Sequence, residues 1–153
     1  MERKVKQQNN TLALHPVIYR GEILPDYWVT VKGEFVSTKQ TLPKILSIQP
    51  GDKWNPYPKV ALRINGKPKC ILVHRLVCET FHKKPLPDIL NEQEWSAIKP
   101  EIAEKLINFV SHADRFQVNH IDHNIDNYHA DNLEWVTVIE NQQKYQQHRK
   151  HSI

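Results

Sequence analysis

The sequence predicts an α+β fold in which small antiparallel β-hairpins come first, helices follow, and a strand–loop–strand–helix segment closes the chain. Three observations predict it. Two pairs of short β-former runs flank turn-forming dipeptides, at Lys32-Gly33 and Asn65-Gly66. The apolar residues then change to helical spacing after residue 73. Finally, a polar loop rich in Asn, Asp and His separates two short strands near the C-terminus.

The N-terminal part of the chain is expected to hold a flexible arm and a small β module. Residues 1–14 are polar and charged, which predicts an arm without fixed structure. The β module spans residues 15–50, and it offers a possible DNA contact. Its clearest hairpin lies at residues 27–37, where two β-former runs flank a Lys-Gly pair. Residues 42–48 are apolar and lie near prolines, which predicts one further extended piece.

Residues 51–153 form the predicted second domain. Its hairpin lies at residues 60–73, because the Asn-Gly pair at its centre suits both positive-φ positions of a type I′ turn. A short amphipathic helix is predicted at residues 74–82, and prolines just beyond end it. Residues 83–115 are a helical insertion, in which Pro100 is expected to begin the second of two helices.

Composition favours a soluble intracellular protein. The 153 residues include 21 basic and 17 acidic side chains and carry a net charge of +4, with a pI near 9.0. This mild basic bias permits a polyanionic partner without demanding one. The N-terminus lacks an apolar signal region, and no apolar run approaches the roughly 20 residues that span a bilayer. Cys70 and Cys78 match no zinc pair and no disulfide framework. We therefore expect a cytoplasmic protein that has no membrane partner.

The polar segment at residues 117–141 carries most of the chemistry. His120 closes a short predicted strand, where a histidine can act as a general base near neutral pH. A lone histidine is more often a surface or hydrogen-bonding group, but this one has oxygen donors around it in Asn119 and Asn141. Hard oxygen ligands suit Mg²⁺ or Mn²⁺, which can stabilise a pentavalent phosphate. Asn132 is placed to fix the imidazole tautomer or to brace the loop.

Two features of this segment set conditions on such a site. Adjacent residues of a regular strand point to opposite faces, so Asn119 and His120 can share a site only if the strand ends or bends there. The C-terminal helix predicted from residue 138 has Gln, Lys, His and Arg on most faces. A helix this polar is weakly buried, so it needs another reason to be ordered.

The segment resembles the HNH endonuclease signature of phage and intron-borne homing endonucleases, which are ββα-metal, or His-Me finger, nucleases. The resemblance is carried by Val118, Asn119, His120, Ile121, Asp122, Asn124, Asn127, residues 132–137, Glu140 and Asn141. Residues 73–77, followed by Phe81, resemble the helix that precedes the motif in that family. Residues 19–37 resemble the small N-terminal module often found before such domains. The resemblance implies a ββα-metal nuclease core preceded by small antiparallel β-hairpins, with a helical insertion.

The resemblance also implies a function and a set of site residues. It implies a metal-dependent DNA endonuclease of the homing type, in which His120 is the general base and Asn132 organises the loop and the base. Asn141 aligns with the helix ligand of a divalent ion, Mg²⁺ or Mn²⁺. Asn119 stands where the family places Asp or Asn as the other ligand, and a neutral Asn implies weaker metal binding than Asp. His74 matches a family histidine outside this set, and structural, DNA-adjacent and direct roles all stay open for it.

The chain departs from the family pattern in three places. The family usually has glycine where this chain has His123, so we expect a positive φ there, which histidine tolerates better than most residues. The linker at residues 83–115 is longer than usual. Many relatives also carry a C-terminal helix-turn-helix module that reads DNA, whereas this sequence stops at Ile153. DNA contacts are therefore expected from the remaining parts of the chain.

Double-stranded DNA is the expected partner, and cations around the site are the candidate phosphate contacts. They are Lys67, Lys69, Arg75, Lys144, His148, Arg149 and Lys150, with Arg3, Lys4 and Lys6 on the arm. Taken singly, each of them is more often an ordinary solvated charge. If about 5 phosphates are neutralised, log K should fall against log salt with a slope of roughly −4 to −5.

Two alternatives to an active nuclease use the same residues. A neutral Asn119 allows a catalytically weak or inactive HNH-derived module that only binds DNA. The histidines together with Cys70 and Cys78 allow a structural zinc domain, although no ligand spacing stands out. For an active enzyme, one site per chain cuts one strand. Nicking by a monomer and double-strand cutting by a homodimer or by two events therefore both stay open.

Overall fold

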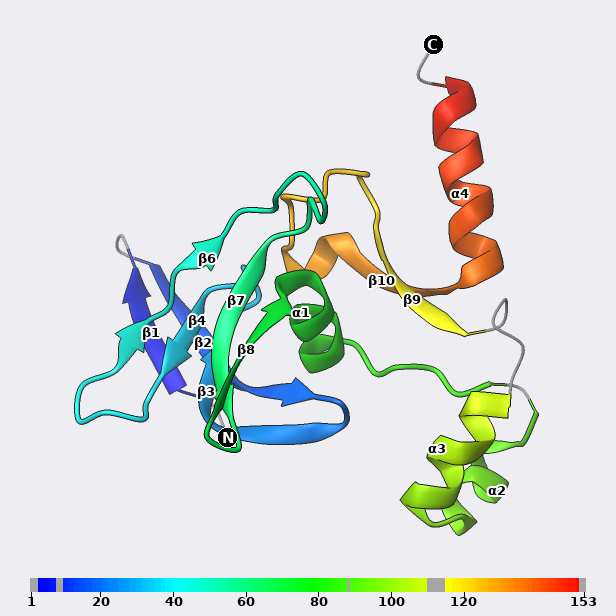
Figure 1. Ribbon diagram of the computed structural model, residues 1–153, viewed down its shortest axis with the longest axis horizontal. Coiled ribbons are helices and arrows are strands. Elements are labelled where there is room, and N and C mark those ends of the chain that lie inside the picture. Colours follow the sequence, from blue (N-terminus) through cyan, green and yellow to red (C-terminus); the bar gives the residue numbers. More distant parts are fainter. Residues whose placement is uncertain (1–2, 8–9, 88, 110–114, 152–153) are drawn as a thin grey trace. The chain divides into compact units, whose positions relative to one another are not determined.

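The structure is a computed structural model of the chain. It describes residues 3–7, 10–87, 89–109 and 115–151 (Figure 1). The chain forms two compact units. The first unit comprises residues 1–83 and 120–134, and the second unit comprises residues 84–119 and 135–153. The polar loop therefore belongs to the first unit, and the C-terminal helix belongs to the second.

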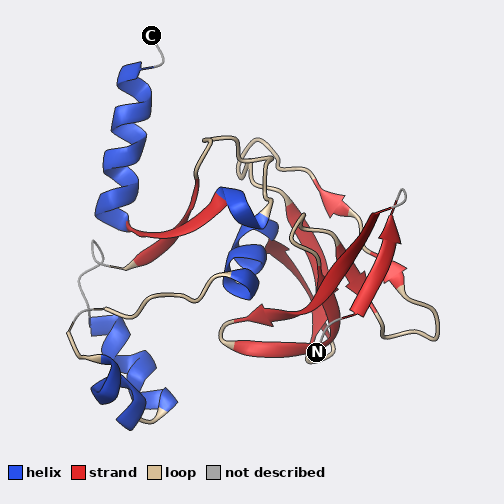
Figure 2. Ribbon diagram, turned by 180° about the vertical axis from the view of Figure 1, so that it is seen from behind, coloured by secondary structure: helices blue, strands red, loops and turns tan. Residues whose placement is uncertain are grey.

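A five-stranded antiparallel sheet forms the larger part of the first unit (Figures 1 and 2). Its strands are adjacent in chain order, as β1 (Arg3–Gln7), β2 (Asn10–Tyr19), β3 (Glu22–Val29), β4 (Phe35–Ser37) and β5 (Lys44–Ile45). The predicted hairpin at residues 27–37 is confirmed, with Trp28 opposite Val36. Leu14 is buried with these two side chains, so three adjacent strands share one apolar cluster that fixes their register.

The flexible arm predicted over residues 1–14 is wrong for the described part of that stretch. Residues 3–7 and 10–14 lie in β1 and β2, which pair antiparallel. Leu14 is only 3% exposed and ties β2 into the core. Residues 3–7 contain no glycine or proline, so they can pair along the edge that β2 offers. Residues 1–2 and 8–9 lie outside the described residues.

The register between β2 and β3 is irregular next to Pro16. Pro16 pairs with Trp28 and Ile18 pairs with Ile23, so β3 has three more residues than β2 between these two pairs. The extra residues of β3 include Asp26, whose φ is 71°. Proline has no N–H to donate to a strand ladder, and an irregular position of this kind is one of the few places in a sheet that tolerate it.

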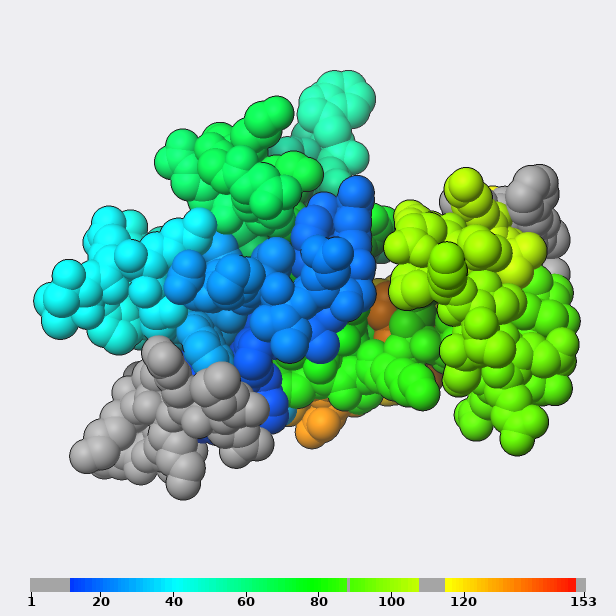
Figure 3. Space-filling model, turned by 90° about the horizontal axis from the view of Figure 1, so that it is seen from below, coloured from blue at the N-terminus to red at the C-terminus, as the bar shows by residue number. Residues whose placement is uncertain are grey.

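A three-stranded antiparallel sheet completes the β-structure of the first unit. Its strands are β6 (Ile48–Gln49), β7 (Lys59–Ile64) and β8 (Lys67–Leu72), in that order. Asn65 and Gly66 have φ angles of 52° and 75°, which confirms the predicted Asn-Gly hairpin. The backbone N–H of Arg63 donates to Tyr27 Oη at 2.8 Å. This bond links the β7–β8 hairpin to β3, and Figure 3 shows the two segments side by side, in green and blue.

Helix α1 (Val73–Phe81) follows β8 directly and packs its apolar face inside the first unit. Val73, Leu76 and Val77 are at most 1% exposed, which confirms the amphipathic helix predicted here. The Val73 N–H donates to Pro58 O at 3.0 Å, so the loop before β7 caps the start of the helix. At its other end, Thr80 Oγ1 accepts from the N–H of Ile18 at 3.1 Å, which attaches α1 to β2.

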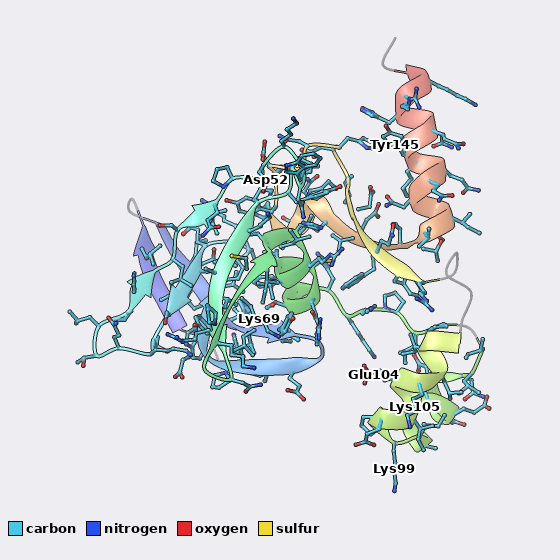
Figure 4. The ribbon with its side chains drawn as sticks, viewed as in Figure 1. Asp52, Lys69, Lys99, Glu104, Lys105 and Tyr145 are labelled. Carbon is cyan, nitrogen blue, oxygen red and sulfur yellow. The ribbon has the colours of Figure 1, made fainter. Side chains whose placement is uncertain are left out.

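The described residues of the second unit form the helices α2 (Glu92–Ala97), α3 (Pro100–Phe109) and α4 (Val138–His151). The two short helices lie in the predicted insertion, and Pro100 begins α3 as expected. Asn91 and Glu94 form a capping box at the start of α2. Trp95 is 7% exposed and donates through Nε1 to Pro87 O at 3.1 Å. Figure 4 labels Lys99, Glu104 and Lys105 in this part of the chain.

A two-stranded pair, β9 (Phe116–His120) and β10 (Leu133–Thr137), frames the polar loop, with a short 3₁₀ turn at Ala130–Asn132 before β10. The predicted strand, polar loop, strand and helix are therefore all present in the expected order. The predicted α+β class with small antiparallel sheets is confirmed. Within the described residues, no helix combines the length and the apolar character needed to cross a membrane.

Candidate active site

The loop between β9 and β10 is held together by its own polar side chains. Asn132 Nδ2 donates to Asp122 Oδ1 and to the Asn127 carbonyl, both at 2.8 Å, and Asn132 Oδ1 accepts from the Asp122 N–H at 3.0 Å. Asn127 Nδ2 donates to Asp122 Oδ2 at 2.8 Å. Asp122, Asn127 and Asn132 thus form one closed hydrogen-bond network. The polar side chains of the loop are therefore satisfied by other groups of the same loop.

The same loop is anchored to the strands and helix of the first unit. The Ala130 N–H donates to Val31 O at 2.8 Å, and Ala130 O lies 2.7 Å from His82 Nε2. Tyr128 packs against Gly33, where a Cβ atom would lie 2.4 Å from the tyrosine ring. His123 has a φ of 61°, so the positive φ expected at this position is confirmed. These contacts give the loop a fixed shape beside β9.

Asn132 therefore braces the loop, which is one of the two roles that its position in the sequence allowed. We expect Asn132→Ala to lower the free energy of unfolding by about 1 to 3 kcal/mol, because the Asp122 N–H and the Asn127 carbonyl lose their partners. Urea unfolding measures the change. Gln143→Ala, at an exposed position of α4, is the matched control. Equal effects of the two substitutions would show that the network contributes nothing.

Asp122 gives the loop a pH dependence of known sign. The pKa of Asp122 is lowered, chiefly by the hydrogen bond from Asn127 and then by those from the Asn124 N–H and from Asn132. Its stabilising effect is therefore fully present above the unfolded pKa and is lost as pH falls through the lowered folded value. We expect acid below the usual Asp pKa of about 3.9 to destabilise the wild type more than Asp122→Asn. Urea midpoints at neutral and acid pH measure this, and parallel loss in both proteins would contradict it.

His120 lies at the edge of this loop in a cluster of three rings, of which the two imidazoles are buried and Tyr57 is half-buried. Its ring centroid is 5.0 Å from that of His74 and 5.9 Å from that of Tyr57, and the Tyr57 and His74 centroids are 4.7 Å apart. His120 is 6% exposed and His74 is 5% exposed. Nε2 of His120 and Nδ1 of His74 are buried and make no hydrogen bond. All three residues belong to the first unit.

Burial keeps both imidazoles neutral. Burial lowers the pKa of His120, and the nearby carboxylates of Asp122 and Asp126 only partly oppose this. Burial also lowers the pKa of His74, to about 3, with His120 and Arg75 adding to the effect. A neutral imidazole has one nitrogen with a lone pair that can accept a proton. His120 therefore has the protonation state that a general base requires.

The two proposed metal ligands lie in the second unit, on β9 and α4. Asn141 Nδ2 donates to Gln117 Oε1 at 3.0 Å. Gln117 and Asn119 are two residues apart in β9 and so share one face of the strand, which places Asn141 over the face that carries Asn119. A capping box holds the start of α4, since Thr137 and Glu140 exchange side-chain and backbone bonds of 3.0 and 3.1 Å.

The side-chain oxygens of Asn119 and Asn141 are of a kind that fits a hard divalent ion, and both are neutral. The Asn141 amide points its nitrogen at Gln117, so its carbonyl oxygen is the atom that would face an ion. Amide oxygens suit Mg²⁺ or Mn²⁺ better than softer metals. Within the described residues, no group of three or more His, Cys, Asp or Glu side chains could hold a metal ion. Cys70 is exposed, and burial raises the pKa of Cys78 to about 12, so that thiol stays protonated.

The candidate phosphate contacts are exposed wherever their side chains are described. Those in the first unit are Lys67 and Lys69 on β8 and Arg75 on α1, and those in the second unit are Lys144, His148, Arg149 and Lys150 on α4. Lys67 and Lys69 share one face of β8 by strand alternation, and Figure 4 labels Lys69 on that hairpin. Arg3, Lys4 and Lys6 lie in β1.

Sequence reasoning missed two residues that touch the candidate site residues. Tyr57 lies in a loop whose Pro, Gly and Asn residues indicate only that it is a loop. Its ring contacts that of His120, which is more than sixty positions away in the sequence, and no local pattern predicts that contact. Gln117 had a usable signal, because it lies two residues before Asn119 in the same predicted strand and therefore shares its face.

Comparison with known proteins supports an HNH-like fold. No protein-family model matches the chain, and no curated protein matches it. Among solved structures, the chain is similar to one described as "DNA binding and cleavage by the HNH homing endonuclease I-HmuI", with 26% sequence identity and a TM-score of 0.55. The match covers 88% of this chain and 59% of that protein. The chain thus spans about three-fifths of the length of the endonuclease that it resembles.

Proposed function

We propose that this chain is a metal-dependent DNA endonuclease of the HNH homing type, in which His120 activates the water that hydrolyses a phosphodiester bond. One observation carries the proposal. A buried, neutral histidine ends β9 directly after Asn119 and borders a loop that Asp122 and Asn132 hold in a fixed shape. The likeness to an HNH homing endonuclease that binds and cleaves DNA supports the same assignment.

His120 is the base through Nδ1 in this proposal. Its Nε2 atom is buried, which leaves Nδ1 as the ring nitrogen available to water. In the hydrolytic step, the water oxygen bonds to phosphorus while the bond from phosphorus to the leaving ester oxygen breaks. Nδ1 takes the proton that the water loses, and the leaving oxygen gains a proton from solvent. His120 then returns its proton to solvent and is neutral again.

Asn119 and Asn141 are the proposed ligands of one divalent ion. When bound, such an ion supplies positive charge that stabilises the pentavalent phosphate and the leaving oxygen. Gln117 holds the Asn141 amide in the orientation that offers its oxygen. Because both donors are neutral, we expect half-maximal activity only at a higher Mg²⁺ concentration than an Asp-containing site requires.

The exposed cations supply the proposed DNA contacts, and the salt dependence of binding tests them. We expect Lys67→Gln and Lys69→Gln each to make the slope of log K against log salt less negative by about 0.9, because each removes one phosphate contact. Lys99→Gln, at the residue before α3, is the control and should leave the slope unchanged. Fluorescence anisotropy of a labelled duplex over a salt series measures it. An unchanged slope in both hairpin variants would remove β8 from the DNA interface.

Cleavage of a supercoiled plasmid tests the proposed function. We expect relaxed or linear DNA with Mg²⁺ or Mn²⁺, and intact DNA when the ions are chelated. Relaxed product alone indicates nicking, whereas linear product indicates cutting of both strands. The neutrality of Asn119 and Asn141 favours one alternative, an HNH-derived module that binds DNA without cutting it. Binding without cleavage in every divalent ion would support that alternative.

A further inference from the structure

The ring cluster in the first unit contains two buried nitrogen atoms that the proposed function does not explain. Nε2 of His120 and Nδ1 of His74 are both buried, and neither forms a hydrogen bond. Buried polar atoms without partners are rare in folded proteins, because each one loses its bond to water without replacement. Here two such atoms occur on neighbouring rings, so each is the obvious partner for the other.

We propose that His74 is a positioning residue that accepts a hydrogen bond from the Nε2–H of His120 and thereby keeps Nδ1 of His120 unprotonated. The two ring centroids are 5.0 Å apart and the ring planes are inclined at 49°. Since the nitrogens lie on the ring perimeters, this spacing lets nitrogens on facing edges approach the roughly 3 Å of a hydrogen bond. A modest rotation of either ring about its broad χ2 minimum closes the bond.

The acceptor role requires a neutral His74, and its surroundings provide one. His74 is 5% exposed on the buried face of α1. Burial, with smaller contributions from His120 and Arg75, lowers its pKa to about 3. His74 therefore keeps a lone pair on one ring nitrogen at any pH at which a nuclease of this kind works. A histidine that charged near neutral pH would instead donate, and could not take the proton of Nε2.

The consequence for the base follows from imidazole chemistry. A neutral imidazole carries its single proton on either Nδ1 or Nε2, and only the nitrogen without the proton can take one from water. An acceptor beside Nε2 selects the tautomer that leaves Nδ1 available. The ring of Tyr57 lies beside both imidazoles, at centroid distances of 4.7 and 5.9 Å, so it limits how far they can rotate.

The tautomer of His120 tests the inference directly. Nitrogen-15 NMR of the imidazoles, with the His120 signals assigned by their loss in His120→Gln, is expected to show protonated Nε2 and unprotonated Nδ1 in the wild type. In His74→Phe, which keeps an aromatic ring but no acceptor, we expect a mixture of tautomers. His74→Asn offers an amide oxygen close to the position of Nδ1 and should restore the wild-type tautomer. Tyr57→Phe, which keeps the ring contacts, should leave it unchanged.

The kinetic effect rests on the proposed function, whereas the tautomer does not. We expect His74→Phe to lower the single-turnover cleavage rate by about 10- to 100-fold without changing DNA affinity, and His74→Asn to recover most of that loss. Protonated Nδ1 in wild-type His120, or an unchanged tautomer in His74→Phe, would overturn the inference. If His74→Phe does not fold, the wild-type spectrum decides. The predicted tautomer in a wild type that does not cleave DNA would contradict the proposed function alone.

Discussion

His120→Gln is expected to lower the single-turnover rate of DNA cleavage by about 10²- to 10⁴-fold, which is the usual contribution of a general base. Glutamine keeps much of the side-chain volume in the ring cluster, so the packing around Tyr57 and His74 is disturbed less than by alanine. Its amide nitrogen cannot take a proton from water. Quenched-flow cleavage of an end-labelled duplex measures the rate, and anisotropy measures the affinity, which we expect to stay unchanged.

The control for this substitution lies three residues away in the same loop. His123→Asn removes an imidazole while keeping a residue type that tolerates the φ of 61° found at this position. We expect its cleavage rate to stay close to that of the wild type. An equal loss of rate in His123→Asn and His120→Gln would show that the loop as a whole, and not the base, was damaged.

Asn141→Ala has the second large expected effect, on the metal dependence of cleavage. It removes one of only two protein ligands that we assign to the ion. We expect the Mg²⁺ concentration for half-maximal cleavage to rise by at least about 10- to 100-fold, the cost seen even for residues that only support a ligand. Gln142→Ala, at the next position of α4, is the control and should not shift it. Identical Mg²⁺ titrations for Asn141→Ala and wild type would remove Asn141 from the site.

Asn119→Asp changes the same titration in the opposite direction. An aspartate adds negative charge to the ligand set and should lower the Mg²⁺ concentration for half-maximal cleavage. Asn119 is 9% exposed, so burying a carboxylate there costs stability in the absence of metal. We therefore expect the variant to unfold at lower temperature than wild type without metal and to gain more from added Mg²⁺. A thermal shift with Mg²⁺ that matches the wild type would contradict the ligand assignment.

Local patterns predicted most of the elements around the site. The Asn65-Gly66 turn, the helix after β8 and the strand that ends at His120 each follow from a few adjacent residues, and the structure has them there. The positive φ of His123 was expected from the family resemblance, because the family usually has glycine at this position. These features depend on short-range geometry, such as turn angles and the spacing of apolar residues, which a sequence displays directly.

Features that depend on distant contacts did not follow from the sequence. The N-terminal stretch looks like an arm because its polar residues show no strand pattern, yet β1 pairs with β2, which Leu14 ties into the core. Tyr57 contacts His120 only because the folded first unit brings the Tyr57 loop beside His74 and His120. No secondary-structure propensity or sequence motif predicts this contact between Tyr57 and His120, because it results from tertiary packing.

The sequence left the role of Asn132 open between bracing the loop and fixing the imidazole tautomer. The three hydrogen bonds of its side chain go to Asp122 and Asn127, which supports the bracing role. The residue that we propose fixes the His120 tautomer is His74, because the buried nitrogens of these two rings have no other partner. In the candidate site, the polar network of Asp122, Asn127 and Asn132 holds the loop that follows His120, and the ring cluster surrounds the His120 imidazole.

The central claim is that this chain hydrolyses DNA through His120 with a divalent ion. Single-turnover cleavage of an end-labelled duplex by wild type and His120→Gln, each with Mg²⁺ and with a chelator, tests it most directly. We predict cleavage by the wild type with Mg²⁺ and almost none in the other three reactions. Equal cleavage by His120→Gln, or undiminished cleavage with chelator, would contradict the claim.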